Sequence, residues 1–224
     1  MRFITDTMTY EEIANVIIEN VMPSLNYQMG DYNNKLRRVI IKNKKVLEED
    51  KHYFTPFCYK KGNLNVHLVG CSHGKTDYNY SGLTFVVYVT FMYQNGLHAA
   101  MIAGAKYDLI QILTPHLLDR YQERLSKTES NRESLILEYY KNNATVVSDL
   151  NKIPEGIQSK YNKENSTFVS VQEGIVIEER ITKNVFVGRT FVSKELMKQN
   201  QIKDADTQSL QVQIYESVKY KTDI

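Results

Sequence analysis

One short segment of the chain carries side chains whose types and spacing could do chemistry. It runs from Thr114 to Leu125 with the sequence TPHLLDRYQERL, and it places His116, Arg120 and Arg124 at four-residue intervals. On a helix, with about 100° between successive residues, these side chains fall within about 80° of one another. An imidazole can serve as a general base, and guanidinium groups bind phosphates and other anions. We therefore expect a phosphate- or anion-directed site here, with these three side chains as the candidate catalytic residues.

Local signals predict that this segment begins a helix directly after a strand. Thr114 is a favourable N-cap, and Pro115 suits the first helical position, where no backbone N–H is needed. The preceding residues, 107–113, alternate as they would in a strand. The N–H groups at a helix N-terminus favour a bound anion. The cationic stripe borders the apolar face of the helix, where a cleft could form.

The same stripe also has a purely structural interpretation. Arg120 and Arg124 could pair with Asp119, Glu123 or a neighbouring loop, and His116 could be a hydrogen-bonded histidine at a helix start. Polar residues at four-residue spacing occur by chance on many amphipathic helices. Both interpretations stay open at this stage.

The sequence offers no motif for a cofactor and only two neighbouring candidate metal ligands. Cys71 and His73 lie on one face of a predicted strand, about 6.6 Å apart, which is close enough to share a zinc ion. A third ligand would have to come from elsewhere, and we consider reduced, buried thiols at Cys58 and Cys71 the better interpretation. We therefore assign neither a metal nor a cofactor.

Composition excludes several classes of protein. The chain has 224 residues, 42% of them hydrophobic, which is enough for a proper core. A net charge of +2 and a sequence pI of about 8.3 are too mild to indicate nucleic-acid binding by bulk charge. No apolar run is long enough for a membrane span, the N-terminus lacks a signal-peptide layout, and there are only two cysteines. We expect a cytoplasmic protein that does not bind membranes.

The N-terminal part predicts a helix followed by a basic stretch. Thr9 and Glu12 have capping-box spacing before an apolar-periodic run, so a helix is expected from residue 10 up to Pro23. Residues 26–50 fit either a second helix or a strand.

Alternating apolar residues then predict an antiparallel β-meander. Asn95-Gly96 is a favoured pair for a two-residue hairpin turn, and it separates the apolar runs 83–93 and 97–103. The stretch from Gly70 to Gly82 contains Lys75 and joins two strands, so we expect a long hairpin tip and not a phosphate-binding loop. The expected strands of this meander are 64–71, 83–93, 97–103 and 107–113.

The second half of the chain is expected to hold one helix, a polar connection and more strands. The helix is predicted at 115–142, and residues 142–165, with few apolar side chains, should form a loop or mobile lid. Ser193 should cap a short helix, and residues 208–220 fit both strand and helix spacing. The strands expected here are 167–172, 174–180 and 185–192.

These elements predict an α+β fold with a mainly antiparallel sheet and helices packed on one face. We expect a single domain over 1–224, and an alternative subdivision places 1–142 and 166–224 on either side of a polar loop at 143–165.

The segment from His116 to Arg124 resembles the His-x-x-x-Arg-x-x-x-Arg helix of some small domains in the RelE-like toxin superfamily of metal-independent ribonucleases. The resemblance covers nine of the 224 residues. It implies RNA cleavage by acid–base chemistry with an arginine at the phosphate, and it maps only His116, Arg120 and Arg124.

Two functions follow from these residues. One is a metal-independent ribonuclease, in which His116 is the base and Arg120 stabilises the charge developing on phosphorus. Its second acid is unassigned, and Tyr121, Lys75, Lys183 and Arg189 are candidate ligand-binding partners. The other is a non-enzymatic binding or regulatory protein, such as a phage or mobile-element accessory factor, that recognises an anionic ligand, a nucleic acid or a protein partner.

Overall fold

The structure is a computed structural model that describes residues 1–94, 96–104, 108–128, 131–143 and 165–196. Within these residues the protein is α+β, with four α-helices and a mostly antiparallel β-sheet of nine strands. Residue contacts group the chain into two units, Met1–Ile112 and Leu113–Ile224. The mainly antiparallel α+β class expected from the sequence is confirmed.

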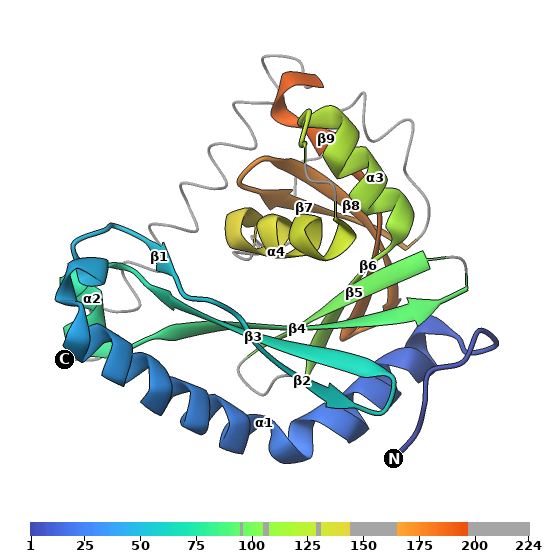
Figure 1. The fold of residues 1–224 in the computed structure, drawn as a ribbon. Helices are drawn as coiled ribbons and strands as arrows, with labels where there is room; N and C mark the ends of the chain where they lie inside the picture. Colours follow the sequence, from blue (N-terminus) through green and yellow to red (C-terminus); the bar gives the residue numbers. More distant parts are fainter. Residues whose placement is uncertain (95, 105–107, 129–130, 144–164, 197–224) are drawn as a thin grey trace. The chain divides into compact units, whose positions relative to one another are not determined.

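The first unit begins with one long helix, α1 (Tyr10–Lys42). The predicted capping box is present, because the Thr9 hydroxyl accepts from the Glu12 N–H and the Glu12 carboxylate accepts from the Thr9 N–H at 2.7 Å. The prediction that the helix ends before Pro23 is wrong. The missing N–H of Pro23 costs one helical hydrogen bond, but the buried face continues past it through Leu25 and Leu36. Burial of this face against the rest of the unit therefore stabilises the helix as far as Lys42. Figure 1 shows that the helix is curved.

The strands of the first unit form the predicted meander, with two short additions. β4 (Thr84–Tyr93) pairs with β3 (Leu64–Ser72) on one side and with β5 (Gly96–Ala103) on the other, all antiparallel. β1 (His52–Tyr53) and β2 (Phe57–Lys61) also pair with β3 and were not anticipated. β6 (Leu109–Leu113) follows β5 and leads into the next helix.

The predicted β4–β5 hairpin is confirmed, with its turn one residue earlier than expected. Gly96 is already the first residue of β5 and pairs with Tyr93, so the connection is residues 94–95. Gln94 takes the positive φ of 47° that a tight hairpin turn requires. Asn95 itself lies outside the described residues.

The connection between β3 and β4 is not the expected hairpin tip. It contains an eight-residue helix, α2 (Gly74–Ser81). Gly74, its first residue, has a positive φ of 90°, and Gly82, the residue after it, has a positive φ of 77°. None of the residues in α2 is buried. The helix was missed because it has no apolar face from which a helical period could be read.

The second unit pairs two helices with a three-stranded meander. The single helix predicted at 115–142 is instead two, α3 (Pro115–Arg124) and α4 (Arg132–Asn143). The chain leaves α3 at Leu125, and Ser126 has a positive φ of 50°, which a continuous helix does not allow. The predicted strands are confirmed as β7 (Ser166–Val171), β8 (Gly174–Thr182) and β9 (Val185–Ser193), paired antiparallel in that order.

Several expectations fall wholly or partly outside the described residues. These are most of the predicted loop at 142–165, whose residues 144–164 are not described, and the segment 208–220. After Ser193 only a short 3₁₀ turn, Lys194–Leu196, is described. The alternative subdivision at residue 142 grouped residues 113–142 with the first strands, whereas in the structure α3 packs on β9. Among the described helices, none has the length and apolar character needed to cross a lipid bilayer.

Candidate functional site

The start of α3 is fixed by its N-cap. The Thr114 hydroxyl accepts a hydrogen bond from the Leu117 N–H at 3.3 Å and donates one to the Gly188 carbonyl of β9 at 2.8 Å. Leu117, Leu118 and Tyr121 bury the inner face of the helix completely. The N-terminus of α3 is thereby held on β9, and its outer face is turned to solvent.

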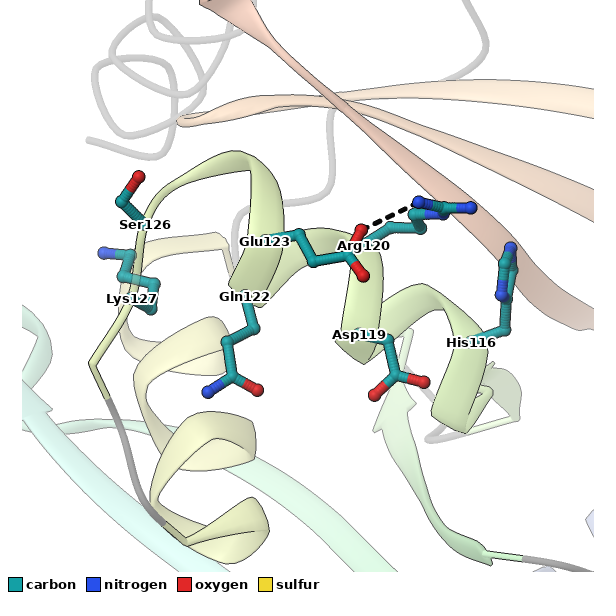
Figure 2. Close-up of a pocket in the computed structure, with 7 residues that line it drawn as sticks. All are labelled: His116, Asp119, Arg120, Gln122, Glu123, Ser126 and Lys127. Atoms are coloured by element: carbon teal, nitrogen blue, oxygen red, sulfur yellow. Dashed lines mark hydrogen bonds and ion pairs between the residues drawn. The ribbon is translucent and has the colours of Figure 1, made fainter.

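The outer face of α3 carries an open depression with a volume of about 490 Å³. Figure 2 shows the His116 and Arg120 side chains pointing to the same side of the helix, whereas Asp119 and Gln122 point away from them. His116 is exposed, and no hydrogen bond of its side chain occurs among the described residues. The structure thus places two of the three predicted residues at one hollow. The residues lining it are His116, Asp119, Arg120, Gln122, Glu123, Ser126 and Lys127.

Arg120 is ion-paired, but only at the surface. Its Nη1 donates to Glu123 Oε2 at 2.7 Å, with the two side chains 43% and 60% exposed. A pair this exposed stabilises a protein by only about 0–1 kcal/mol. An anion of higher charge density could therefore replace Glu123 as the partner of the Arg120 guanidinium at little energetic cost. Asp119, the other carboxylate of the depression, is paired with Arg132 of α4.

Arg124 lies on the same helix but is tied to the sheet. Its guanidinium donates a hydrogen bond to the backbone carbonyl of Phe191 in β9. Arg124 does not line the depression. This contact gives Arg124 a structural role, because it satisfies a strand carbonyl and holds the C-terminal end of α3 against β9.

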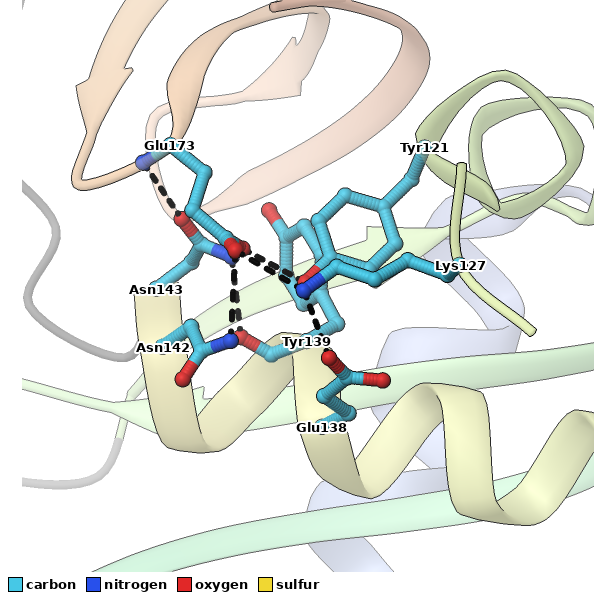
Figure 3. Close-up of polar contacts among 7 residues, drawn as sticks. All are labelled: Tyr121, Lys127, Glu138, Tyr139, Asn142, Asn143 and Glu173. Atoms are coloured by element: carbon cyan, nitrogen blue, oxygen red, sulfur yellow. Dashed lines mark hydrogen bonds and ion pairs between the residues drawn. The ribbon is translucent and has the colours of Figure 1, made fainter. Parts of the chain in front are cut away.

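Tyr121 is directed inward, into a polar network centred on Glu173. Its hydroxyl donates to the Glu173 carboxylate at 2.5 Å, and its ring packs against Phe191 with centroids 5.2 Å apart. The same carboxylate accepts from Lys127 Nζ at 3.1 Å and from Asn143 Nδ2 at 2.9 Å, as Figure 3 shows. Lys127 also donates to Glu138 at 2.6 Å. The network joins α3, α4 and the β7–β8 turn.

The pKa values within this network are consistent with fixed charges. Burial, with the hydrogen bond to Glu173, raises the pKa of the Tyr121 hydroxyl far above its usual value, so it remains a donor. Burial alone would raise the pKa of Glu173, but hydrogen bonds from Tyr121, Asn143 and Lys127 outweigh it and lower that pKa. Burial would lower the pKa of Lys127, yet Glu138 and Glu173 together raise it. The network is a set of charged and polar contacts that stabilises the second unit. The Tyr121 hydroxyl is hydrogen-bonded to Glu173 within it.

The remaining predicted ligand-binding residues lie elsewhere. Arg189 on β9 donates from Nε and Nη2 to Glu179 Oε2, at 2.8 and 2.6 Å. Lys75 lies on α2 in the other unit. Neither lines the depression on α3.

The cysteines are thiols, but only one is buried as expected. Cys71 is 2% exposed, and burial raises the pKa of its thiol. Cys58 is exposed and lies in β2, which among the described strands pairs only with β3. His73 is hydrogen-bonded to Thr84 at 3.1 Å. Within the described part of the chain, no three His, Cys, Asp or Glu side chains are grouped so that they could hold a metal ion.

The residues that sequence reasoning missed come from the turns. Lys127 lies just after α3 and Glu173 in the two-residue β7–β8 turn, where neither period nor motif marks them. In the sequence each is only a charged residue in a short connection, and such side chains usually point into solvent. Asn143, at the end of α4, closes the network by accepting from the Glu173 N–H at 3.2 Å.

Comparison of the chain with models of protein families, with curated proteins and with solved structures gives no match.

Proposed function

We propose that the protein is a non-enzymatic binding protein that holds an anionic group of its ligand, such as a phosphate, in the depression on α3. The observation that carries this proposal is the pair of His116 and Arg120 side chains, which point to the same side of α3 beside its N-terminus. An imidazole can donate to an oxyanion, a guanidinium can donate two parallel hydrogen bonds, and the positive end of the helix dipole favours an anion.

The energetics of the Arg120 ion pair support ligand exchange at this position. Glu123 holds the guanidinium in a pair that is about half exposed on each side. Such a contact is worth about 0–1 kcal/mol, whereas charge-assisted hydrogen bonds to phosphate are individually stronger. Glu123 therefore serves as a weak internal competitor, and an incoming phosphate would displace it.

The contacts of the other residues favour binding over RNA cleavage. A metal-independent ribonuclease needs a base, an acid and cations at one phosphate. Arg124 is engaged with a strand carbonyl, Tyr121 is buried against Glu173, and Arg189 and Lys75 do not line the depression. Of the predicted residues, only His116 and Arg120 line the depression, and two groups of this kind suffice for recognition.

Binding and cleavage can be separated with two oligonucleotides. We expect a fluorescent single-stranded RNA and its 2′-O-methyl analogue, which cannot be cleaved through the 2′-OH, to bind with similar affinity by anisotropy. His116→Ala and Arg120→Ala should each weaken binding about tenfold, a loss typical of one charge-assisted hydrogen bond. The matched control is Arg38→Ala, which removes an exposed arginine from α1. RNA cleavage that disappears in His116→Ala would establish the ribonuclease instead, and no binding of either probe would refute the anion site.

A substitution of the competitor should act in the opposite direction. Glu123→Gln removes the carboxylate that pairs with Arg120 and one negative charge from the depression. We expect affinity for the 2′-O-methyl probe to rise about two- to fivefold, which corresponds to the worth of an exposed ion pair. Glu179→Gln, which breaks the exposed pair with Arg189, is the control and should leave the affinity unchanged. An unchanged affinity in Glu123→Gln would show that Arg120 does not contact the probe.

A further inference from the structure

Three neighbouring strands of the first unit bring a thiol, an imidazole and a hydroxyl together. In the register of the sheet, Cys58 of β2 lies directly opposite His67 of β3, and His67 lies directly opposite Tyr88 of β4. Directly opposed residues in antiparallel strands present their side chains on the same face. Thr90 lies two residues beyond Tyr88 and so is diagonal to His67 on that face. This face is the one turned away from α1, because Gly70 on the opposite face packs against Leu36.

The three polar groups form one continuous chain of contacts. Cys58 Sγ lies 3.0 Å from His67 Nδ1, and His67 Nε2 lies 3.0 Å from Thr90 Oγ1. The His67 ring is stacked on Tyr88, with centroids 4.6 Å apart and an interplanar angle of 5°. His67 is 9% exposed and Thr90 1%, whereas Cys58 is exposed. The imidazole is thus held in one orientation, with one nitrogen directed at an accessible thiol.

We propose that Cys58 is a nucleophilic thiol activated by His67, with Thr90 as the positioning residue. This arrangement has the general form of an activated nucleophile: a base within hydrogen-bonding distance, itself oriented by a third group. When Thr90 accepts from Nε2–H, the Nδ1 lone pair faces the thiol and can take its proton. The resulting imidazolium then donates to the thiolate from Nδ1 and to Thr90 from Nε2, so both N–H groups are satisfied. A thiolate beside an imidazolium is the reactive form of cysteine.

The substrate class that fits this thiol is a low-molecular-weight disulfide. Cys71, the other cysteine of the chain, lies four residues beyond His67 on β3, about 13 Å along the strand. An internal disulfide requires Cα atoms within about 7 Å of each other. A disulfide between Cys58 and Cys71 is therefore too long for this fold, and exchange would leave a mixed disulfide with the small molecule.

The exchange balances without a further reagent. The Cys58 proton moves to His67 Nδ1, and the thiolate attacks one sulfur of the small disulfide. A new S–S bond to Cys58 forms as the old one breaks, and the leaving sulfur departs with the electron pair as a thiolate. It then takes the proton back from His67. The Cys58 sulfur is oxidised and the leaving sulfur is reduced.

Alkylation kinetics of the full chain test the activation. At pH 7 an ordinary cysteine is only a few per cent thiolate, so an ion-paired Cys58 should react with iodoacetamide about tenfold faster than a cysteine in an unstructured peptide. Mass spectrometry of peptides distinguishes Cys58 from the buried Cys71, which serves as the internal control. His67→Asn keeps a polar atom near the thiol but cannot take its proton, and the Cys58 rate should fall to that of the peptide. Thr90→Val should lower the rate less, because it frees the ring without removing the base.

The same samples test the proposed reaction with glutathione disulfide. The parent protein should form one mixed disulfide, at Cys58, and His67→Asn should form it at the rate of the peptide thiol. Thermal midpoints show whether each variant is folded. If His67→Asn has lost its fold, the Cys58 rate of Thr90→Val decides whether the proposal holds. A parent rate equal to that of the peptide would overturn the proposal. So would a Cys58 rate that is unchanged in folded His67→Asn, or unchanged in Thr90→Val where that variant decides.

Discussion

Replacement of Gly174 by alanine is expected to lower the free energy of unfolding of the second unit by about 3 kcal/mol, or to prevent its folding. A Cβ at this position would overlap the Val192 carbonyl oxygen and would lie 2.7 Å from Phe191 Cζ. A carbonyl in a paired strand cannot move aside without breaking the β8–β9 register, in which Gly174 pairs with Ser193. Amide hydrogen exchange of β8 and β9 in the full chain measures this loss locally.

The control for this substitution is another glycine replaced by alanine. Gly30 lies within α1, and a Cβ there would meet nothing within 4 Å. Because alanine is the better helix former, Gly30→Ala should raise stability by about 0.5–1 kcal/mol. Protection of β8 and β9 in Gly174→Ala that equals the parent's would show that the close approach is not structurally required.

Replacement of Glu173 by alanine should also destabilise the second unit by about 3 kcal/mol, because the change removes the shared acceptor of several hydrogen bonds and takes away the carboxylate partner of the buried Tyr121 hydroxyl. The carboxylate accepts from Tyr121, Lys127 and Asn143, and the Tyr121 ring is fully buried. Glu179→Ala on β8 is the control. It removes a carboxylate from an exposed pair with Arg189 and should cost about 0–1 kcal/mol. Equal effects of the two substitutions in urea unfolding would contradict a bracing role for Glu173.

The contribution of Glu173 should depend on pH in a defined direction. Its pKa is lowered in the folded protein, so it stabilises the fold above the unfolded-state value of about 4.3, and this stability is lost as pH falls through the folded pKa. The difference in unfolding free energy between the parent and Glu173→Gln should therefore be full at pH 7 and shrink below about pH 4.3. A difference that stays constant down to acid unfolding would argue against an ionised Glu173 in the network.

Local signals predicted most elements of the fold, and tertiary contacts decided the exceptions. The capping box at Thr9 and the strand alternation of β3 to β5 act within a few residues, so they can be read directly from the sequence. Pro23 is a strong local stop signal, but burial of Leu25 and Leu36 against the sheet outweighs the lost hydrogen bond. The break after α3 was missed, although every residue from Ser126 to Ser134 is polar and interrupts the apolar helical period for more than two turns.

The candidate site was only partly predictable, because some of its contacts join residues that are far apart in the sequence. Helical spacing placed His116 and Arg120 on one side of α3. It also grouped Arg124 with them, but the partner of Arg124 is a carbonyl in β9, 67 residues later in the chain, which no local pattern encodes. Glu173 and Cys58 were missed because their partners, Tyr121 and His67, become neighbours only through strand pairing and helix packing.

Titration of the isotopically labelled chain with inorganic phosphate and with the 2′-O-methyl oligonucleotide, followed by ¹H–¹⁵N spectra, tests the proposed binding role most directly. We predict that saturable shifts concentrate on the first turns of α3, from His116 to Arg120, and on the Arg120 side chain, and that they disappear in the Arg120→Ala variant. Saturable shifts that avoid α3, or spectra that remain unchanged with both probes, would contradict an anion-binding role for this helix.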